Sequence, residues 1–444
     1  MQRIVFEDIP IMEQMNLWKS FIDTWVGGCT TNLEYIESLP KNSTLKSTDF
    51  DLTIMPSIDN CFIAVGLELN VKHFVWDMVG TYITDNAAMA HGLDMNPSFV
   101  PPQFLPNEVI SDRMSFVQRM KSLFFSLMVQ SIMFSSSGTF ARINNNYRAP
   151  PNQDRPDLNW QMPYNVDGIL INGEPVLDFP RPLFHTVSFI GKLNDGNAEQ
   201  KDQSLSAEWL AIAEDKDYDG FVVLSFGTVA QAQYMPVEMR EAILNELTQL
   251  SQYKVIWRFE EHFPAADEAP NVHRSKWMPQ KALLKHPRCA CFITHGGYNS
   301  LLESAQAGVP LVLVPLFADQ AANVARAVRH GLGIAIRKTE LTETGVLSDA
   351  VRSVIRDKRF AHNAHKLNRM IKDTLGEPYL AVDQRLKWLI KPHRKRFYDV
   401  RKIAELPLYK YLLLDVLAFW SLVFGTVIYL FLRCLIGVMK KIGR

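Results

Sequence analysis

The chain has 444 residues, of which 47% are hydrophobic and 21% are charged, as in ordinary globular proteins. This length accommodates two domains of ordinary size, each with its own core. The 47 Lys and Arg residues balance the 47 Asp and Glu residues. No excess of positive charge favours nucleic acid, so no nucleic-acid partner is expected.

Cysteine spacing and the N-terminal residues carry little information about the cellular compartment. The five cysteines form no zinc-finger spacing. Cys289 and Cys291 alternate on a predicted buried strand, which favours a place in the core. The first residues show no basic segment followed by an apolar one, so they predict no signal peptide.

The predicted elements of the N-terminal half are short and irregularly spaced. The stretches DLTIMPS (51–57) and VKHFVWDM (71–78) predict strands, and a long amphipathic helix is expected from about Asp112 to Ser135. The stretch GILINGEPVLDF (168–179) reads as a strand and a turn. Residues 179–197 have the composition of a linker that leaves a first domain.

From Asp219 onward strands and helices alternate regularly. The expected order is strand 220–226, helix 236–251, strand 253–259, a short helix after Trp277, strand 289–295, helix 299–308, strand 309–315, helix 319–331 and strand 332–336. Short, continuously apolar strands between helices predict an α/β fold in which helices cover both faces of a parallel sheet.

The stretch FITHGGYNSLLESAQAG (292–308) places polar groups where such a sheet binds ligands. His295 ends its strand, and ligands bind outside the carboxyl ends of parallel strands. Gly296 and Gly297 let the backbone approach a ligand closely. Asn299 and Ser300 open a helix whose first N–H groups and positive dipole end favour a phosphate. His295 is expected to donate to the same phosphate.

Three further side chains suit the sugar parts of a nucleotide sugar. Glu303 lies on the same helix face as Asn299 and is expected to accept hydrogen bonds from a ribose diol. Asp319 and Gln320 follow the next strand and suit sugar hydroxyls. The alternative is ordinary helix capping by Asn299 and Ser300, which accounts for those two residues but not for the whole set.

Two other loops complete the predicted donor site. The stretch SFGT (225–228) is a second glycine loop at a strand end, with Ser225, Gly227 and Thr228 able to approach phosphate or ribose. The stretch WMPQ puts Trp277 on a rigid loop where a base can stack on it, with Gln280 at the edge of the base. The set needs no metal ion and no resident cofactor, since the nucleotide sugar is a co-substrate.

Residues 276–320, KWMPQKALLKHPRCACFITHGGYNSLLESAQAGVPLVLVPLFADQ, resemble the signature region of the UDP-glycosyltransferases, the family of the UDP-glucuronosyl- and UDP-glucosyltransferases. The resemblance is most specific over 221–336 and extends through the N-terminal half. It implies a GT-B fold, in which two Rossmann-like domains face each other across a cleft. It also implies a binding role for each candidate residue. His295, Asn299 and Ser300 would bind the diphosphate, and Glu303 would bind the ribose. Trp277 would stack on uracil, and Asp319 and Gln320 would bind the sugar.

The resemblance also implies a domain plan. The expected segments are an acceptor-side domain with a linker (1–190), a UDP-sugar-binding domain (191–390), a basic juxtamembrane segment (391–411), a transmembrane helix (412–433) and a short basic tail (434–444). Residues 412–432 form an apolar run of about the length that spans a bilayer. The body is expected in the lumen of the endoplasmic reticulum, although the basic residues before the helix favour the cytosol by charge counting. The sequon at Asn42 would distinguish the two orientations.

The family pattern breaks in the acceptor-side domain. The resemblance implies a catalytic histidine on a loop after an early strand, oriented by a carboxylate on a later strand. The first histidine here is His73, and the carboxylate position falls at about Pro56, with Asp59 a weak substitute. The catalytic residues therefore stay unknown, and the chain is expected to lack the first strand and helix units of this domain and to transfer slowly.

The leading hypothesis is a membrane-anchored UDP-glycosyltransferase that transfers glucuronic acid or a hexose from UDP-glucuronic acid or UDP-glucose to a small lipophilic acceptor, with inversion. The alternative is a catalytically silent UDP-sugar-binding isoform that pairs with active relatives as a homo- or hetero-oligomer. A nucleotide-dependent oxidoreductase is disfavoured, because no GxGxxG motif follows an early strand.

Overall fold

The structure of the chain is a computed structural model. It describes residues 5–6, 28–29, 31–36, 38–40, 42–56, 61–80, 96–101, 110–135, 166–181, 183, 186–191, 204–374, 378–391, 408–411 and 413–442. The chain forms two compact units, Met1–Lys391 and Pro392–Arg444. Both parallel sheets belong to the first unit.

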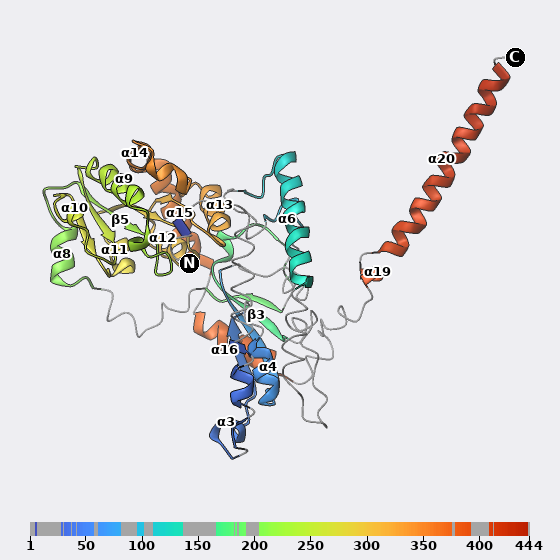
Figure 1. Cartoon of the computed structure of the whole chain (residues 1–444), viewed down its shortest axis with the longest axis horizontal. Helices are drawn as coiled ribbons and strands as arrows, with labels where there is room; N and C mark the ends of the chain where they lie inside the picture. The colour runs from blue at the N-terminus through green and yellow to red at the C-terminus, as the bar shows by residue number, and fades with distance from the viewer. Residues whose placement is uncertain are drawn as a thin grey trace. The chain divides into compact units, whose positions relative to one another are not determined.

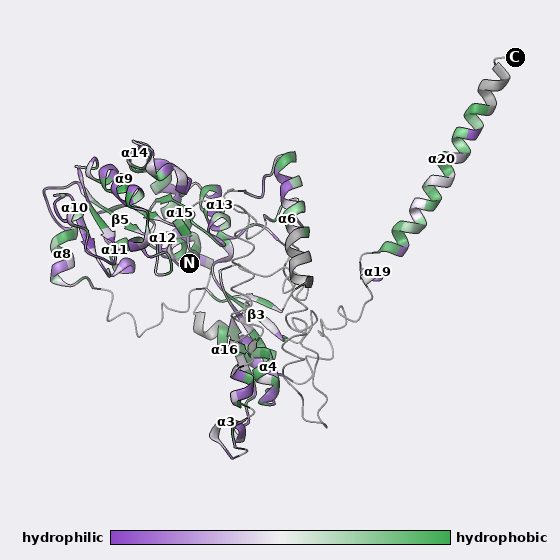
Figure 2. Ribbon diagram, in the orientation of Figure 1, coloured by the Kyte–Doolittle hydropathy of each residue, from purple (hydrophilic) through white to green (hydrophobic). Residues whose placement is uncertain are grey.

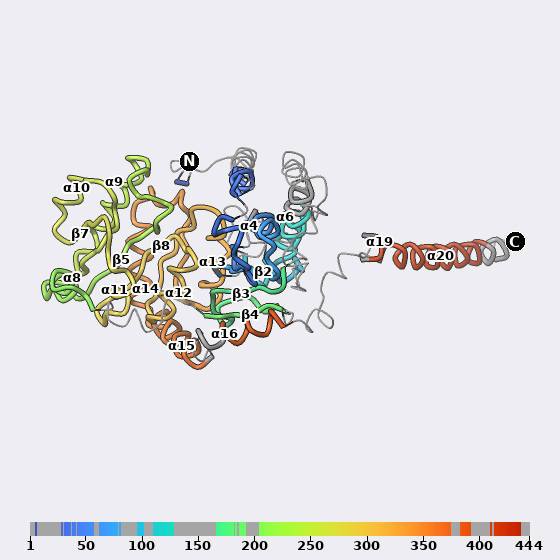
Figure 3. The backbone as a smooth tube through the Cα atoms, turned by 90° about the horizontal axis from the view of Figure 1, so that it is seen from below, coloured from blue at the N-terminus to red at the C-terminus, as the bar shows by residue number. Residues whose placement is uncertain are grey.

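The N-terminal part of the first unit contains a four-stranded parallel sheet, here called the first sheet (Figure 1). Its strands follow one another in the order β1-β2-β3-β4, and Figure 3 shows β2, β3 and β4 side by side. Their bounds are Leu52–Pro56, His73–Val79, Gly168–Asn172 and Val187–Phe189. The strands predicted within 51–57, 71–78 and 168–179 are confirmed.

Helices cover both faces of the first sheet. The elements of this part are α3 (Thr44–Ser47), α4 (Cys61–Glu68), α6 (Phe116–Ser135) and the short 3-10 helix η2 (Pro175–Leu177), and α16 (Pro378–Leu389) returns from the C-terminal side. Trp76 lies in a buried cluster with residues of α4. Val75, its neighbour in β2, points to the opposite face and packs with residues of α16. The long helix predicted from about Asp112 is confirmed and begins at Phe116.

The second part of the first unit contains a six-stranded parallel sheet, here called the second sheet, in the order β10-β9-β8-β5-β6-β7. In chain order the strands β5 to β10 are Gly220–Ser225, Tyr253–Arg258, Val272–Ser275, Cys289–Thr294, Leu311–Leu313 and Gly333–Ala335. The regular alternation predicted from Asp219 onward is confirmed, except that the edge strand β7 was not predicted. Cys289 and Cys291 are free thiols in β8; Cys291 is buried in the core, as predicted, and Cys289 is half-buried against it.

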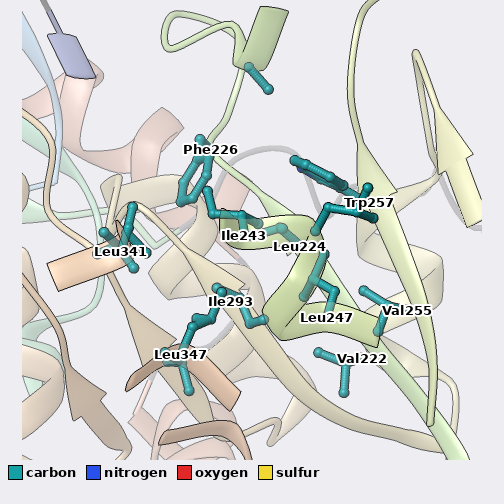
Figure 4. Close-up of a cluster of buried hydrophobic side chains, with 14 of the residues drawn as sticks. Val222, Leu224, Phe226, Ile243, Leu247, Val255, Trp257, Ile293, Leu341 and Leu347 are labelled. Atoms are coloured by element: carbon teal, nitrogen blue, oxygen red, sulfur yellow. The ribbon is translucent and has the colours of Figure 1, made fainter. Parts of the chain in front are cut away.

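Helices lie on both faces of the second sheet. They are α8 (Ala207–Ala213), η4 (Ala232–Tyr234), α9 (Val237–Thr248), α10 (Pro264–Asp267), α11 (Gln280–Lys285), α12 (Tyr298–Ala307), α13 (Gln320–Arg329), η5 (Lys338–Thr342), α14 (Val346–Arg356) and α15 (Lys358–Thr374). Val222 and Leu224 of β5 pack with residues of α9 and α14, as Figure 4 shows for Ile243, Leu247 and Leu347. The alternate residues of β5 pack with α11, α12 and α15. Continuous apolar strands therefore follow from burial on both faces.

The register of the second sheet brings three strand ends to one edge. Ser225 pairs with Thr294, and Thr294 pairs with Leu313, so β5, β8 and β9 finish at the same level. Neighbouring strands lie about 4.8 Å apart. The loops that follow these strands therefore start next to one another, at the carboxyl edge where ligands bind in such sheets.

The second unit contains α19 (Leu408–Tyr411) and α20 (Leu414–Ile442). Within the described part of the chain, Leu414–Ile436 is the one stretch of helix long and apolar enough to cross a membrane, with a mean hydropathy of 1.9. Figure 2 shows most of α20 in the hydrophobic colour. The expected span of 412–433 lies at nearly the same place.

Some sequence predictions are not tested by the structure. Asp59 and residues 392–407 of the basic segment lie outside the described residues. The predicted borders at 190, 390, 411 and 433 stay predictions.

Candidate functional site

Two glycine loops enclose the imidazole of His295 at the carboxyl edge of the second sheet. A β-carbon added to Gly227 would lie 2.7 Å from Cε1 of His295, and one added to Gly297 would lie 2.5 Å from Nε2. Gly227 has a φ of +79°, in the left-handed region that favours glycine. The backbone N–H of Gly227 also donates to Oγ of Ser225 at 3.3 Å. The structure thus brings Ser225, Gly227, His295 and Gly297 together, as the sequence predicts.

Burial determines the charge of His295. Burial lowers the pKa of His295 to about 4, and a hydrogen bond to the backbone of Ser225 offsets part of this effect. The ring is therefore neutral at pH 7 and carries a single N–H. An anion placed beside the ring would raise the pKa of His295 again.

The N-terminus of α12 lies directly after this loop. Gly297 is the N-cap residue, and no side chain makes a capping hydrogen bond there. The alternative that Asn299 and Ser300 serve only as ordinary caps is therefore wrong. Asn299 is exposed in the first turn of α12, and Ser300 is buried. The first N–H groups of a ten-residue helix, with its positive dipole end, face the same edge as His295.

The loop after β7 reaches α12 through a direct hydrogen bond. Nε2 of Gln280 donates to Oε2 of Glu303 at 2.8 Å, which fixes the carboxylate at the outer side of the edge. Trp277, three residues earlier, is 68% exposed, an unusual place for an indole. Oγ of Ser275 donates to the carbonyl of Trp277 at 2.6 Å and holds the loop. Thr228 is likewise exposed, on the loop after β5.

The loop after β9 brings Asp319 and Gln320 beside the glycine loop. A β-carbon added to Gly296 would lie 3.4 Å from the carbonyl oxygen of Gln320. Burial raises the pKa of Asp319, and its carboxylate accepts from Nδ2 of Asn323 at 2.8 Å. Ala318 has a φ of +56°, a strained value for a residue with a β-carbon. Strain of this kind is typical of a loop held in place for binding.

Gln320 has a structural role, holding the loop after β9, that the sequence does not show. Its Oε1 accepts from the backbone N–H groups of Leu316 at 2.8 Å and Phe317 at 3.1 Å, and the residue is 4% exposed. The carboxamide oxygen therefore closes the loop after β9. Its Nε2 group is the part of the side chain with hydrogen-bond donors to offer a sugar hydroxyl.

Tyr298, which the sequence analysis did not single out, connects this loop to the first sheet. Its ring fills the space beside Gly80 at the end of β2, where an added β-carbon would lie 2.5 Å from Cγ of Tyr298. Its hydroxyl accepts from the backbone N–H of Glu174 at 3.0 Å. The first residue of α12 thus inserts between two loops at the carboxyl edge of the first sheet. A large aromatic residue directly after two glycines was the available signal.

Within the first sheet, the structure separates the two edges. His73 begins β2 at the amino edge, where its Nδ1 lies 3.2 Å from Oδ2 of Asp167. Pro56 ends β1 at the carboxyl edge and is paired in register with Asp77 of β2. The carboxyl oxygen Oδ1 of Asp77 is buried and has no hydrogen-bond partner among the described residues. Asp77 was also missed, although an acid inside an apolar strand stretch was visible in the sequence.

The fold and the sequence both match known glycosyltransferases. The "UDP-glucoronosyl and UDP-glucosyl transferase" family model matches residues 6–444. The Caenorhabditis elegans protein ugt-60, which carries a UDP-glucuronosyltransferase name, is 33% identical over 387 residues, 86% of this chain and 74% of the relative. Human UDP-glucuronosyltransferase 1A4 is 29% identical, over 94% of this chain and 74% of the relative. The mouse 2-hydroxyacylsphingosine 1-beta-galactosyltransferase is 30% identical, over 87% and 68% respectively.

Solved structures give the same fold at low sequence identity. The glycotransferase of kitacinnamycin aligns with a TM-score of 0.54 at 16% identity, covering 85% of this chain and 84% of the other. The calicheamicin glycosyltransferase CalG4 aligns with a TM-score of 0.52 at 19% identity, covering 84% and 83%. These neighbours have the GT-B fold that the sequence resemblance implied. The chain belongs to the UDP-glucuronosyl and UDP-glucosyl transferase family, and it is a UDP-glycosyltransferase with a GT-B fold.

Proposed function

We propose that this enzyme transfers glucuronic acid or a hexose from UDP to a small lipophilic acceptor, with inversion at the anomeric carbon. The observation that carries the donor half of this proposal is the enclosed imidazole of His295 between Gly227 and Gly297, at the N-terminus of α12. Helix N-termini and close glycine backbone suit a diphosphate. Gln280, at the start of α11, donates to Glu303 of α12, and this hydrogen bond would hold the carboxylate for the ribose diol.

Each part of the donor has a proposed partner. His295, Asn299 and Ser300 would hold the diphosphate, with Ser225, Gly227 and Thr228 on its other side. Trp277 would stack on uracil, and its exposure leaves the ring face free to do so. Asp319 and Gln320 would bind the sugar hydroxyls from the loop after β9. Asp319 and Asn323 are joined by a hydrogen bond, which holds the Asp319 carboxyl group in place at this loop.

The proposal includes neither a metal ion nor a resident cofactor. The positive end of α12 and the His295 ring would provide the electrostatic stabilisation that a diphosphate leaving group requires. Chelation by EDTA is therefore expected to leave UDP affinity unchanged in calorimetry. A loss of affinity that added Mg²⁺ restores would contradict this part of the proposal.

Two observations support a lipophilic acceptor. One relative is named for galactosyl transfer to 2-hydroxyacylsphingosine, and α20 would hold the enzyme at a membrane, where lipophilic compounds concentrate. An activity assay can decide whether the donor is UDP-glucuronic acid or UDP-glucose. Transfer from each donor to a phenolic acceptor, with the product resolved by mass spectrometry, identifies the sugar directly.

We propose that the body lies in the lumen of the endoplasmic reticulum. Asn42, in the sequon Asn42-Ser43-Thr44, is exposed, and Cys29 is disulfide-bonded. Disulfides persist in oxidising compartments, and N-glycans are added in the lumen. A glycosidase-sensitive mass shift that disappears in Asn42→Gln is expected. Complete digestion of the body by protease in sealed microsomes would contradict the luminal orientation.

The donor site is tested by UDP affinity. We expect His295→Ala and Glu303→Ala each to weaken UDP binding by roughly tenfold to a hundredfold, since each removes a hydrogen bond of about 1.5–3 kcal/mol to a charged group. His286→Ala and Glu268→Ala are matched controls, because these residues precede β8 and β7 at the opposite edge of the sheet. Unchanged affinity in both site variants would overturn the assignment.

A further inference from the structure

Asp319 begins α13, but its carboxylate does not cap the helix. It is the N-cap residue, and its side chain makes no capping hydrogen bond. Aspartate is common at this position because its carboxylate usually accepts from the first backbone N–H groups of the helix. Here the backbone carbonyl of Asp319 accepts from the N–H of Asn323 at 3.1 Å. The carboxylate oxygen Oδ2 accepts from Nδ2 of the same asparagine at 2.8 Å, so Asn323 determines where this carboxylate lies.

Asn323 uses both ends of its carboxamide and is 2% exposed. While Nδ2 donates to Asp319, Oδ1 accepts from Nη1 of Arg326 at 3.1 Å. A carboxylate only accepts hydrogen bonds and a guanidinium only donates them, so a flipped amide would lose both bonds. The two charged neighbours therefore fix the orientation of the amide.

Arg326 connects this pair to the loop after β3. The residue is 1% exposed, and its Nε donates to Oδ1 of Asp178 at 2.9 Å. Its guanidinium also lies 5.0 Å from the centre of the Phe179 ring. The planar fork of an arginine holds two acceptors in fixed directions at once. One set of hydrogen bonds, here called the polar network, thus runs from the loop after β3 to the loop after β9 through Asp178, Arg326, Asn323 and Asp319.

An ion pair between the two parts of the unit does not by itself require Asn323. Asp178 also accepts from Arg181 at 3.1 Å and from the backbone N–H of Phe179 at 2.8 Å. An apolar side chain in the place of Asn323 would leave these bonds intact. What Asn323 adds is its contact with Asp319. Burial raises the pKa of Asp319, and the hydrogen bond from Asn323 and the charge of Arg326 lower it, so the network favours the ionised form that accepts from hydroxyls.

We propose that Asn323 and Arg326 are positioning residues for the donor sugar, and that they make sugar binding depend on the loop after β3. This inference rests on the sugar role of Asp319 proposed above. With Oδ2 held by Asn323, Oδ1 of Asp319 can accept from the sugar hydroxyls. Because the polar network ends on Asp178, a shift of the loop after β3 would move this carboxylate. Sugar affinity would then change while the contacts to uracil and diphosphate stay the same.

The test compares a ligand that contains the transferred sugar with one that lacks it, in the full-length enzyme. The variant Asn323→Leu keeps the size of the side chain. We expect its calorimetric affinity for UDP-glucose or UDP-glucuronic acid to fall by roughly tenfold to a hundredfold, the effect of losing one hydrogen bond to a charged group. The affinity for UDP should stay within about twofold of the parent, because UDP has no transferred sugar to contact Asp319.

Asn271→Leu is the matched control for the removal of a buried carboxamide. Asn271 is 4% exposed, and its Nδ2 donates to the carbonyl of Leu247 at 2.9 Å. It precedes β7 at the amino edge of the second sheet, away from the donor loops. The variant should lose stability and keep the parent ratio of UDP-sugar affinity to UDP affinity.

A double-mutant cycle shows whether Asn323 acts through Asp319. Asp319→Ala alone should weaken UDP-sugar binding and leave UDP binding unchanged. In that background Asn323→Leu should have little further effect on the ratio of the two affinities, because the carboxylate that it positions is gone. Arg326→Lys keeps a positive charge beside Asp178 but replaces the fork by a single ammonium group. It should lower the same ratio by a smaller factor, and it gives the readout if Asn323→Leu does not fold.

Two results would overturn the proposal. The first is a ratio of UDP-sugar affinity to UDP affinity within about twofold of the parent in both Asn323→Leu and Arg326→Lys. The second is an equal effect of Asn323→Leu with and without the Asp319 side chain, which would make Asn323 a structural residue only. Failure of the proposed sugar site is a different result, because it would show as unchanged UDP-sugar affinity in Asp319→Ala.

Discussion

The two sheets of this enzyme place their chemistry in different ways. In the second sheet the candidate groups lie on loops after strands, where Gly227, Gly296 and Gly297 permit close backbone approach. In the first sheet the acidic residue Asp77 lies inside a strand among apolar residues. A ligand cradled by backbone requires unusual conformations and therefore glycine motifs. A single polar side chain inside a strand requires no unusual backbone conformation, and it leaves no motif.

The largest expected effect is a loss of stability when the buried ion pairs of Asp178 are removed. These pairs connect the part of the chain that contains the first sheet to the part that contains the second. Asp178, next to η2, accepts from Nε of Arg326 in α13 at 2.9 Å and pairs with Arg181 at 3.1 Å, and all three side chains are buried. Asp178→Ala would leave two buried arginines without this carboxylate, at a cost of about 3–5 kcal/mol in unfolding free energy. Urea unfolding followed by tryptophan fluorescence measures this loss.

The matched control is the partly exposed pair of Arg329 and Asp112, at 3.0 Å, which also joins the two parts. Asp112→Ala is expected to cost no more than about 1 kcal/mol, because water replaces the lost partner. Equal losses in the two variants would show that burial does not decide the strength of the connection.

The next effect should appear within the second sheet, at its glycine cradle. Gly227→Ala forces a β-carbon toward the His295 ring and into a positive φ, which costs about 1–2 kcal/mol for the backbone alone. UDP affinity should fall by roughly tenfold or more, measured by calorimetry. Gly345→Ala carries the same backbone penalty at a φ of +85°, with its nearest contact 3.6 Å away. It should lower stability but leave UDP affinity unchanged; a similar affinity loss there would weaken the cradle interpretation.

Tyr298→Phe tests the contact between the sheets at the edge of the cleft. Removing the hydroxyl leaves the buried N–H of Glu174 without that acceptor, at a cost of about 1–3 kcal/mol. The expected signature is a lower midpoint in urea together with a raised KM for the acceptor. Phe keeps the ring against Gly80, so a complete loss of UDP binding would contradict the assignment of the hydroxyl to the first sheet.

The smallest expected effect is the uptake of a fraction of a proton when UDP binds. Because the pKa of His295 is about 4, the ring is neutral at pH 7, and a bound diphosphate would raise that pKa. UDP binding should then take up a fraction of a proton, and affinity should rise as the pH falls toward the pKa of the bound state. Calorimetry in two buffers of different ionisation enthalpy measures the uptake. His295→Gln should remove this contribution; identical uptake in parent and variant would assign the proton to UDP itself.

The same histidine sets a stability dependence in the free enzyme. Its folded pKa lies below the ordinary value of 6.5, so the unfolded state binds the proton more readily. Stability is therefore lost as the pH falls from about 6.5 through 4, and this part of the loss should be smaller in His295→Gln.

Much of the second sheet could be predicted from the sequence, because its strands are continuously apolar and its helices follow regular spacing. The glycine loops also predicted the residues around His295. The neutral state of His295 could not be predicted, since it depends on desolvation by side chains far apart in sequence. The loop-closing task of Gln320 was hidden as well, because it depends on two backbone N–H groups in the preceding loop.

The first sheet was harder to interpret for a physical reason. Its strands were predicted, but the sequence does not show which residues lie beside Asp77 across the ladders or which edge of the sheet it approaches. His73 and Asp167 show the reverse case, since they form a close pair at the edge away from the donor loops. The direction of strand β2 decides which of these residues lies near which edge of the sheet. The sequence of one segment alone does not reveal that direction.

The most direct test of the account is hydrogen–deuterium exchange of the full-length enzyme with and without UDP. We predict slower exchange on UDP binding in the loops at the carboxyl edge of the second sheet, 226–230, 277–281, 295–301 and 317–320, with no change at the amino edge near 286–289. Unchanged exchange at 295–301 in the presence of saturating UDP would contradict the assignment of this edge as the donor site.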